Sequence, residues 1–230
     1  MPAKCTTPPT TEPLTLAEAK AHLKEIVTNA DVDAEINMSI KAVRELCEND
    51  CRRAFMKQSW QISLDQFPRP QWNYASAAWY GPQWDVSPGP LITVLPEGST
   101  GYEIYLPYPP LLTVDSINYI DGNGVAQTLN PLTDIIVDSI SEPARIVPSF
   151  GVTWPQTQKQ INAMTIGFSC GYNTDPADAS LVPACAKQWM KAMLGTVHEM
   201  RQGEFAAYRE TLLVPAHVDR LLDPIRIRRY

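Results

Sequence analysis

The chain has 230 residues, 44% of them hydrophobic, so it can bury a sizeable core in one domain or in two closely joined ones. Its formal net charge of -6 gives no support for the basic surface of a protein that grips nucleic acid. It has no apolar run approaching the ~18 residues of a membrane span and no signal peptide, so we expect a protein of the reducing cytosol with five free cysteines.

A capping box and apolar periodicity predict two helices near the N-terminus. After an extended leader over residues 1–13, Thr15 and Glu18 form a capping box at the start of a helix that runs to about Val27. A second helix is expected from about Asp31 to Phe55, because its apolar residues recur at steps of three and four. We expect its opposite, polar face to carry Asp33, Asn37, Lys41, Arg44 and Glu48.

The middle of the chain has the two-residue period of β-strands. Residues 60–64 alternate between apolar and polar side chains. Further strands are expected at 102–106, 112–120, 125–129, 134–139, 144–148 and 161–170. Asp121–Gly124 predicts a hairpin, because asparagine and glycine tolerate positive φ. Helical sequence resumes after Pro183, and a short helix is expected over 215–222.

These elements predict an α+β fold in which a β-rich region is inserted between helices. We expect an antiparallel helix pair and C-terminal helices, residues 14–56 and 182–223, to pack together as a helical domain. Residues 57–172 would form a small antiparallel β-sandwich or barrel, and residues 224–230 a basic tail.

The aromatic loop, residues 68–100, has no helical or strand period and is rich in prolines and glycines. Its five large aromatic residues argue against simple disorder. They either fill a small core of the loop itself or contact a neighbouring subunit or partner. The candidate contact residues are Trp72, Tyr74, Trp79, Tyr80 and Trp84.

The end of the chain is a basic patch in an acidic protein. Isoleucines alternate with arginines there, a pattern that suits a segment added as a strand to a partner's sheet, with its arginines paired to acidic groups. The alternative is a frayed, solvated terminus. The candidate docking residues are Ile225, Arg226, Ile227, Arg228, Arg229 and Tyr230.

No sequence motif indicates catalysis or metal binding. His198 and Glu199 resemble the start of a zinc-protease motif, but the second histidine is missing. Cys47 and Cys51 share a helical face, yet two thiols with no nearby histidine favour core packing over a metal site. There is no nucleophile elbow or phosphate loop. We therefore expect no enzyme activity and no cofactor, and only the aromatic loop suggests a glycan-binding or hydrolase module.

One set of short sequence segments is informative through the order and spacing of its members along the chain. It comprises Pro13–Leu23, Trp60–Pro68, Leu106–Leu112, Val114–Gly124, Glu142–Ile146, Trp154–Pro155, Ile166–Tyr172 and Val182–Gln188. In these segments the chain resembles the head–tail connector proteins of tailed bacteriophages, also called adaptor or head completion proteins. The resemblance covers roughly residues 13–68 and 102–202, whereas the aromatic loop is longer than expected for the family.

The resemblance implies a structural protein of the virion neck, made in the host cytoplasm. It implies a ring of about twelve copies that extends the DNA channel below the portal. The implied partners are the portal protein and a tail-side stopper, tail-completion or tail-tube protein. DNA would pass without sequence-specific binding, and no membrane is involved. The family has no catalytic residues to carry over, and residues 225–230 would dock onto the portal. Another tail-completion or baseplate structural protein is the alternative.

Overall fold

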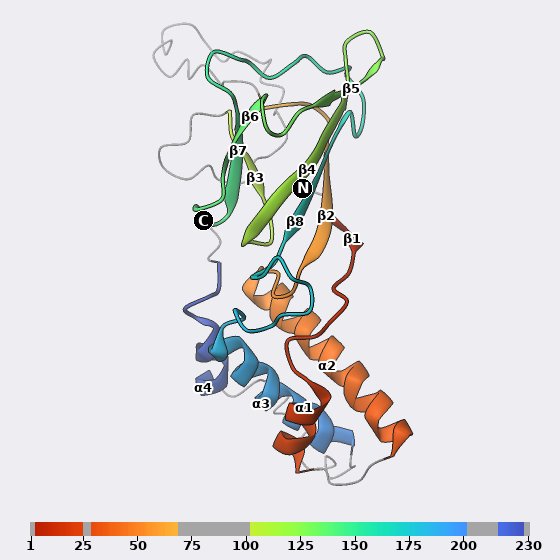
Figure 1. Ribbon diagram of the computed structural model, residues 1–230, viewed down its shortest axis with the longest axis vertical. Helices are drawn as coiled ribbons and strands as arrows, with labels where there is room; N and C mark the ends of the chain where they lie inside the picture. Colours follow the sequence, from red (N-terminus) through yellow and green to blue (C-terminus); the bar gives the residue numbers. More distant parts are fainter. Residues whose placement is uncertain (1–2, 25–28, 69–101, 202–215, 228–230) are drawn as a thin grey trace, which may run out of the picture.

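Helices gather at one end of the molecule and strands at the other, stacked along its long axis (Figure 1). The computed structural model describes residues 3–24, 29–68, 102–201 and 216–227. In chain order the elements are β1 (Ala3–Thr7), α1 (Leu16–Leu23), α2 (Ala30–Cys51), β2 (Gln58–Leu64), β3 (Ile104–Leu106), β4 (Leu111–Ile120), β5 (Ala126–Leu129), β6 (Ile135–Asp138), β7 (Ala144–Pro148), β8 (Met164–Cys170), α3 (Ala184–Arg201), α4 (Ala216–Asp219) and the 3₁₀ helix η3 (Arg220–Leu222).

Local side-chain caps start the first two helices. The Thr15 hydroxyl accepts a hydrogen bond from the Glu18 amide at 3.2 Å, and the Thr15 amide donates to the Glu18 carboxylate at 3.0 Å. The capping box predicted for α1 is therefore present. Asn29 caps α2 by accepting a hydrogen bond from the Asp31 amide at 3.1 Å.

The second helix ends earlier than its apolar pattern predicts. Arg52 takes a left-handed conformation with φ of 57°, and its amide donates to the Glu48 carbonyl, which closes α2 at Cys51. Only residues 52–57 separate α2 from β2, so one short link joins the helical part to the β part.

The helical part encloses its own apolar core. α2 and α3 pack against each other, while α1 and η3 contact α3. The largest side chains buried in this core are Phe55, Met56, Trp189 and Met190. The expectation that the N-terminal and C-terminal helical segments pack together agrees with this arrangement.

The polar face expected for α2 is wrong at two positions. Arg44 is only 2% exposed and Glu48 only 8% exposed. Glu12 from the segment after β1 accepts a hydrogen bond from Arg44 Nε at 2.7 Å. A charge on a helix can be buried when a partner arrives from elsewhere in the chain, and helical periodicity does not report such a partner.

Two antiparallel sheets form the β part. The first has five strands in the order β1-β2-β8-β4-β5, and the second has three in the order β3-β7-β6. Their apolar side chains share one core, to which Ile62, Ile117 and Ile166 contribute from the first sheet and Ile104 and Ile146 from the second. The α+β prediction is therefore confirmed, and the β part is a small sandwich.

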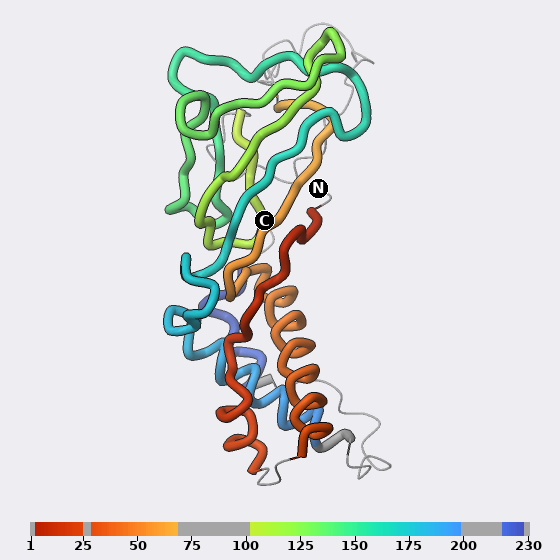
Figure 2. The backbone as a smooth tube through the Cα atoms, turned by 45° about the vertical axis from the view of Figure 1, so that its right-hand side comes forward, coloured from red at the N-terminus to blue at the C-terminus, as the bar shows by residue number. Residues whose placement is uncertain are grey.

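The expected leader contains an edge strand. Ala3, Lys4 and Cys5 of β1 pair with Ile62, Gln61 and Trp60 of β2 in an antiparallel register. The chain then descends from the β part alongside the helices (Figure 2). A five-residue strand that pairs with a partner more than fifty positions away leaves little local signal in sequence.

Candidate assembly surfaces

The C-terminal segment lies against the junction of the two parts, and its predicted docking residues Ile225, Arg226 and Ile227 are held there. Ile225 packs on the helical core. The Ile227 amide donates a hydrogen bond to the Cys51 carbonyl at 3.2 Å, at the end of α2. Ile227, the last described residue, therefore lies at the height of this junction.

Three aspartates surround the Arg226 guanidinium. It donates hydrogen bonds to Asp219 at 2.8 Å and to Asp50, and Asp223 lies 3.5 Å away. The hydrogen bond to Asp219, followed by that to Asp50, raises the pKa of Arg226. All three acids belong to the same subunit, so this arginine is already paired within the protein.

A second arginine joins three segments at the same junction. Arg53, which follows α2, donates two hydrogen bonds to the Glu142 carboxylate and one to the Ile225 carbonyl. Glu142 lies in the turn between β6 and β7, so the contact connects α2, the three-stranded sheet and the C-terminal segment. Burial disfavours the Arg53 charge, but the hydrogen bond to Glu142 and the neighbouring Tyr172 raise its pKa overall. Burial also raises the pKa of Tyr172.

The other predicted contact residues lie outside the described residues. They are Arg228, Arg229 and Tyr230 at the C-terminus and Trp72, Tyr74, Trp79, Tyr80 and Trp84 in the aromatic loop. Their roles stay predictions.

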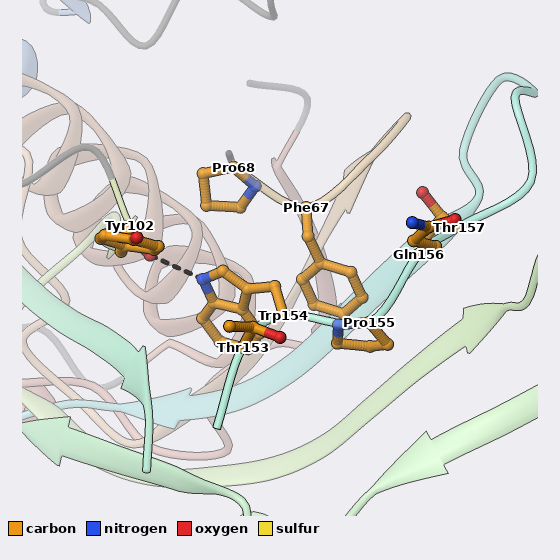
Figure 3. A pocket seen from close by; sticks show the side chains of 8 residues that line it. All are labelled: Phe67, Pro68, Tyr102, Thr153, Trp154, Pro155, Gln156 and Thr157. Atoms are coloured by element: carbon orange, nitrogen blue, oxygen red, sulfur yellow. Dashed lines mark hydrogen bonds between the residues drawn. The ribbon is translucent and has the colours of Figure 1, made fainter. Parts of the chain in front are cut away.

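A hollow of about 350 Å³ lies beside both ends of the aromatic loop. Phe67 and Trp154 stack there with ring centroids 4.8 Å apart, and Trp154 Nε1 donates to the Tyr102 carbonyl at 2.7 Å (Figure 3). The lining is completed by Pro68, Thr153, Pro155, Gln156 and Thr157. Among the described residues that line the hollow, none is a carboxylate, histidine, lysine or cysteine.

Large exposed apolar side chains gather on the β part. Phe150 is 100% exposed and Leu132 is 91% exposed, and both precede or follow strands of the three-stranded sheet. The others on this part are Val125, Ile136, Val137, Ile140, Val152 and Ile161. Sequence reasoning missed these exposed residues, two of which, Leu132 and Phe150, lie in turn-forming sequence.

Within the described ranges, no cluster of three or more histidine, cysteine or acidic side chains is suited to hold a metal ion. None of the described helices is long and apolar enough to cross a membrane.

Comparison with solved structures finds the same fold in virus-like particles. A chain in the neck of an empty gene transfer agent particle, computed with C6 symmetry, has a TM-score of 0.68 at 17% identity. A chain in the virion of the native particle has a TM-score of 0.67 at 16% identity, and one in the native neck computed with C12 symmetry has 0.62 at 17%. Each match covers 100% of this chain and 97% of the other.

No family model and no curated protein matches the sequence. The structural likeness shows a shared fold, and this fold agrees with the resemblance to head–tail connectors seen in the sequence. Along its whole length, the chain has the fold of a protein chain in the neck of gene transfer agent particles.

Proposed function

We propose that the chain is a structural protein of a virion neck, where copies form a ring adaptor between the portal vertex and the tail. The observation that carries this proposal is the match of the entire chain to 97% of a neck chain. A shared fold alone does not fix function. Here the helical part, the β part and their junction all correspond, and the sequence independently resembles connector proteins.

The symmetry of the matched necks supports a ring of twelve copies. Those structures were computed with C12 and C6 symmetry. In a ring, each copy uses two different lateral faces, and its two ends are free to meet different partners. The stacked arrangement in Figure 1 suits this role, because the helical end and the β end present different chemistry.

The charge of the chain suits a channel through which DNA passes. A net charge of -6 per copy, repeated around a ring, repels the phosphate backbone rather than retaining it. We therefore propose that DNA meets this protein without sequence-specific binding.

Contacts to partners are proposed at two segments. Residues Ile225–Ile227 form the base of a tail whose last residues, Arg228, Arg229 and Tyr230, dock onto acidic groups of the portal. The two arginines are better candidates than Arg226, which three aspartates already surround. The aromatic loop supplies a further subunit or partner contact through the five aromatic residues predicted from sequence.

The role is tested by removing the gene in the cell that makes the particles and examining the particles by electron microscopy. We expect filled or empty heads without attached tails, and restoration of tails by the full-length chain. In particles carrying a tagged copy, the label should lie in the neck with twelvefold symmetry. Normal tailed particles from cells without the gene would contradict the proposal.

Portal docking is tested by comparing two truncations in a binding assay with purified portal. Removing residues 228–230 should weaken binding at least tenfold and leave the unfolding midpoint unchanged, since no internal contact described above is lost. Removing 224–230 should also destabilise the subunit, because the contacts of Arg226 and Ile227 go with it. The matched control is Arg220→Gln, which removes an exposed arginine elsewhere and should bind normally.

A further inference from the structure

The three-stranded sheet ends in an apolar edge. β6 pairs through Ile135–Asp138 with β7 in a continuous register, and the described part of the chain places no strand on its other side. Ile136 and Val137 are both exposed. The strand is short, with four residues, and it ends in Asp138, but it contains no lysine, proline or bulge to keep its open edge from pairing with another chain.

Two turns beside this edge hold apolar side chains in solvent. Leu132 lies in the turn before β6, and its amide donates to the Asn130 side chain at 3.0 Å. Phe150 lies in the turn after β7, where the Val152 amide donates to the Ser149 carbonyl at 2.9 Å.

The two turns are joined to each other. The Ser149 hydroxyl donates to the Thr133 carbonyl at 2.7 Å, and the Ser149 amide donates to the Asp134 carbonyl at 3.0 Å. The turns that carry Leu132 and Phe150 are thus held together by hydrogen bonds. With Ile136 and Val152, these two side chains form what we name the β6 surface.

β5, an outer strand of the other sheet, has the exposed polar side chains that are usual at the edge of a sheet. β5 ends the five-stranded sheet with Gln127 and Thr128 exposed, and the Thr128 hydroxyl donates to Asn118 at 2.8 Å. The contrast shows that open edges in this protein are not apolar by default. An exposed apolar edge flanked by exposed apolar turns is typical of a surface that is covered in an assembly.

We infer that the β6 surface is the lateral contact with the neighbouring copy of this chain, an inference that rests on the proposed ring. A ring contact is heterologous, so the β6 surface meets a different face of the next copy. Figures 1 and 2 place β6 and β7 on one flank of the β part and β1 on the other. The facing surface on the neighbour is therefore the flank that carries β1.

The test replaces Phe150 with the photo-reactive residue benzoylphenylalanine in the full-length chain. A fully exposed position tolerates the larger side chain without disturbing the core. Irradiation of particles should give a species of twice the subunit mass, in which position 150 is joined to a peptide from the β1 flank of a second copy. The matched control carries the same residue at Met38, an exposed site on α2, and should give no such pair.

Other cross-links would overturn the inference. A product with a different protein means that the β6 surface meets a partner of another kind, and a product within the same subunit at residues 69–101 means that the chain covers its own edge. A link between two copies of position 150 indicates a two-fold pair rather than a ring contact. In each case the protein is still found in the neck, so the proposed function survives.

Failure of the proposed function looks different. If particles lack the chain, the proposed function fails, and the lateral contact that rests on it fails as well. Phe150→Asp and Leu132→Asp provide a second measurement, since each should reduce ring formation at least tenfold with an unchanged unfolding midpoint. Met38→Asp, at an exposed position on α2 in the helical part, is the control and should assemble normally. Normal rings from both variants would also overturn the inference.

Discussion

A buried cluster of charged side chains binds the N-terminal segment to α2. Arg44 donates to Glu12 at 2.7 Å and to Glu48 at 2.5 Å. The other Glu48 oxygen accepts from the Phe55 amide at 2.9 Å and from the Gln58 side chain at 3.0 Å. One carboxylate therefore contacts α2, the link after it and β2, and its arginine partner adds the segment that follows β1.

Replacing Arg44 with methionine should destabilise the protein by about 3 kcal/mol, because Glu48 and Glu12 lose the charge that compensates their burial. Urea unfolding measures this loss. Glu45→Gln is the matched control: it removes a half-exposed partner of the same arginine and should cost under about 0.5 kcal/mol. Equal stability of Arg44→Met and the wild type would show that the cluster adds nothing net.

The same cluster predicts a pH dependence with a definite sign. Burial raises the pKa of Glu48 above its ordinary 4.5, despite the attraction of Arg44. The folded protein then binds more protons than the unfolded chain, so the contribution of Glu48 to stability falls as pH rises from 4.5 through the folded-state pKa. The free energy of unfolding of wild type relative to Glu48→Gln should fall over that window in urea titrations.

Asp138 provides a comparison of opposite sign. Hydrogen bonds from Ser141, and then from Arg145, lower the pKa of this carboxyl below its ordinary 3.8. Its contribution is present above pH 3.8 and is lost as pH falls through the lower folded-state value. Any advantage of wild type over Asp138→Asn should therefore shrink below pH 3.8. A pH-independent difference in either pair of proteins would contradict the assignment.

At the scale of elements, the chain after β8 passes close to the link between α2 and β2, and this close approach depends on a single glycine. Gly171 has φ of 139°, and a Cβ there would lie 2.7 Å from the Met56 carbonyl oxygen and 2.8 Å from the Lys57 amide nitrogen. Its amide donates to the Pro110 carbonyl at 3.0 Å. The residue that follows β8 can therefore pass against the α2–β2 link only without a side chain.

Gly171→Ala should lower the free energy of unfolding by about 2–3 kcal/mol, since it adds backbone strain and a clash with main-chain atoms that cannot move away. Gly122→Ala is the control, because nothing lies within 4 Å of a Cβ at that position and its φ is not in the left-handed range. Thermal unfolding of the two variants provides the comparison, and a similar midpoint for both would refute the crossing argument.

Local signals predicted most of the elements. The box at Thr15 and Glu18, the alternation over 60–64 and the glycine-rich turn at Asp121–Gly124 each depend on residues a few positions apart, and each is present. At the turn, Asp121 Oδ1 accepts hydrogen bonds from the Asn123 and Val125 amides at 2.8 and 3.0 Å. Such contacts join residues that are close together in the sequence, so the local sequence predicts them.

Distant contacts account for what sequence reasoning missed. β1 is a strand because β2 offers an edge, Arg44 is buried because Glu12 reaches it, and Arg226 is paired because Asp50 and Asp219 meet there. None of these partners is visible in the periodicity of its own segment. The candidate tail was identified from its basic pattern, whereas its attachment at Ile225–Ile227 required the folded chain.

At the scale of the molecule, two cores meet at one junction. Phe55 and Met56 belong to the helical core, while Ala54 beside them belongs to the β core. Arg53 adds the hydrogen bonds to Glu142 and Ile225 across the same place. The two parts are therefore expected to unfold together, because few residues separate their cores.

Arg53→Met should uncouple the two parts. In hydrogen exchange, amides of α2 and β8 should open with the same free energy in wild type and with different free energies in the variant, because the contact from the helical part to the β6–β7 turn is gone. Arg52→Met is the neighbouring control, since the side-chain hydrogen bonds to Glu142 and to the Ile225 carbonyl come from Arg53. Unchanged, equal exchange in Arg53→Met would show that apolar packing alone couples the cores.

The direct passage from α2 into β2 gives the subunit a fixed height. A helix of 22 residues is roughly 33 Å long and a strand of seven residues roughly 23 Å, and only a short link separates them. The spacing between whatever binds at the two ends is then set by covalent geometry and by the ladder of β2, not by weak contacts. In the proposed ring, every copy would therefore hold its two ends the same distance apart, and an insertion within residues 52–57 would change that distance equally in all copies.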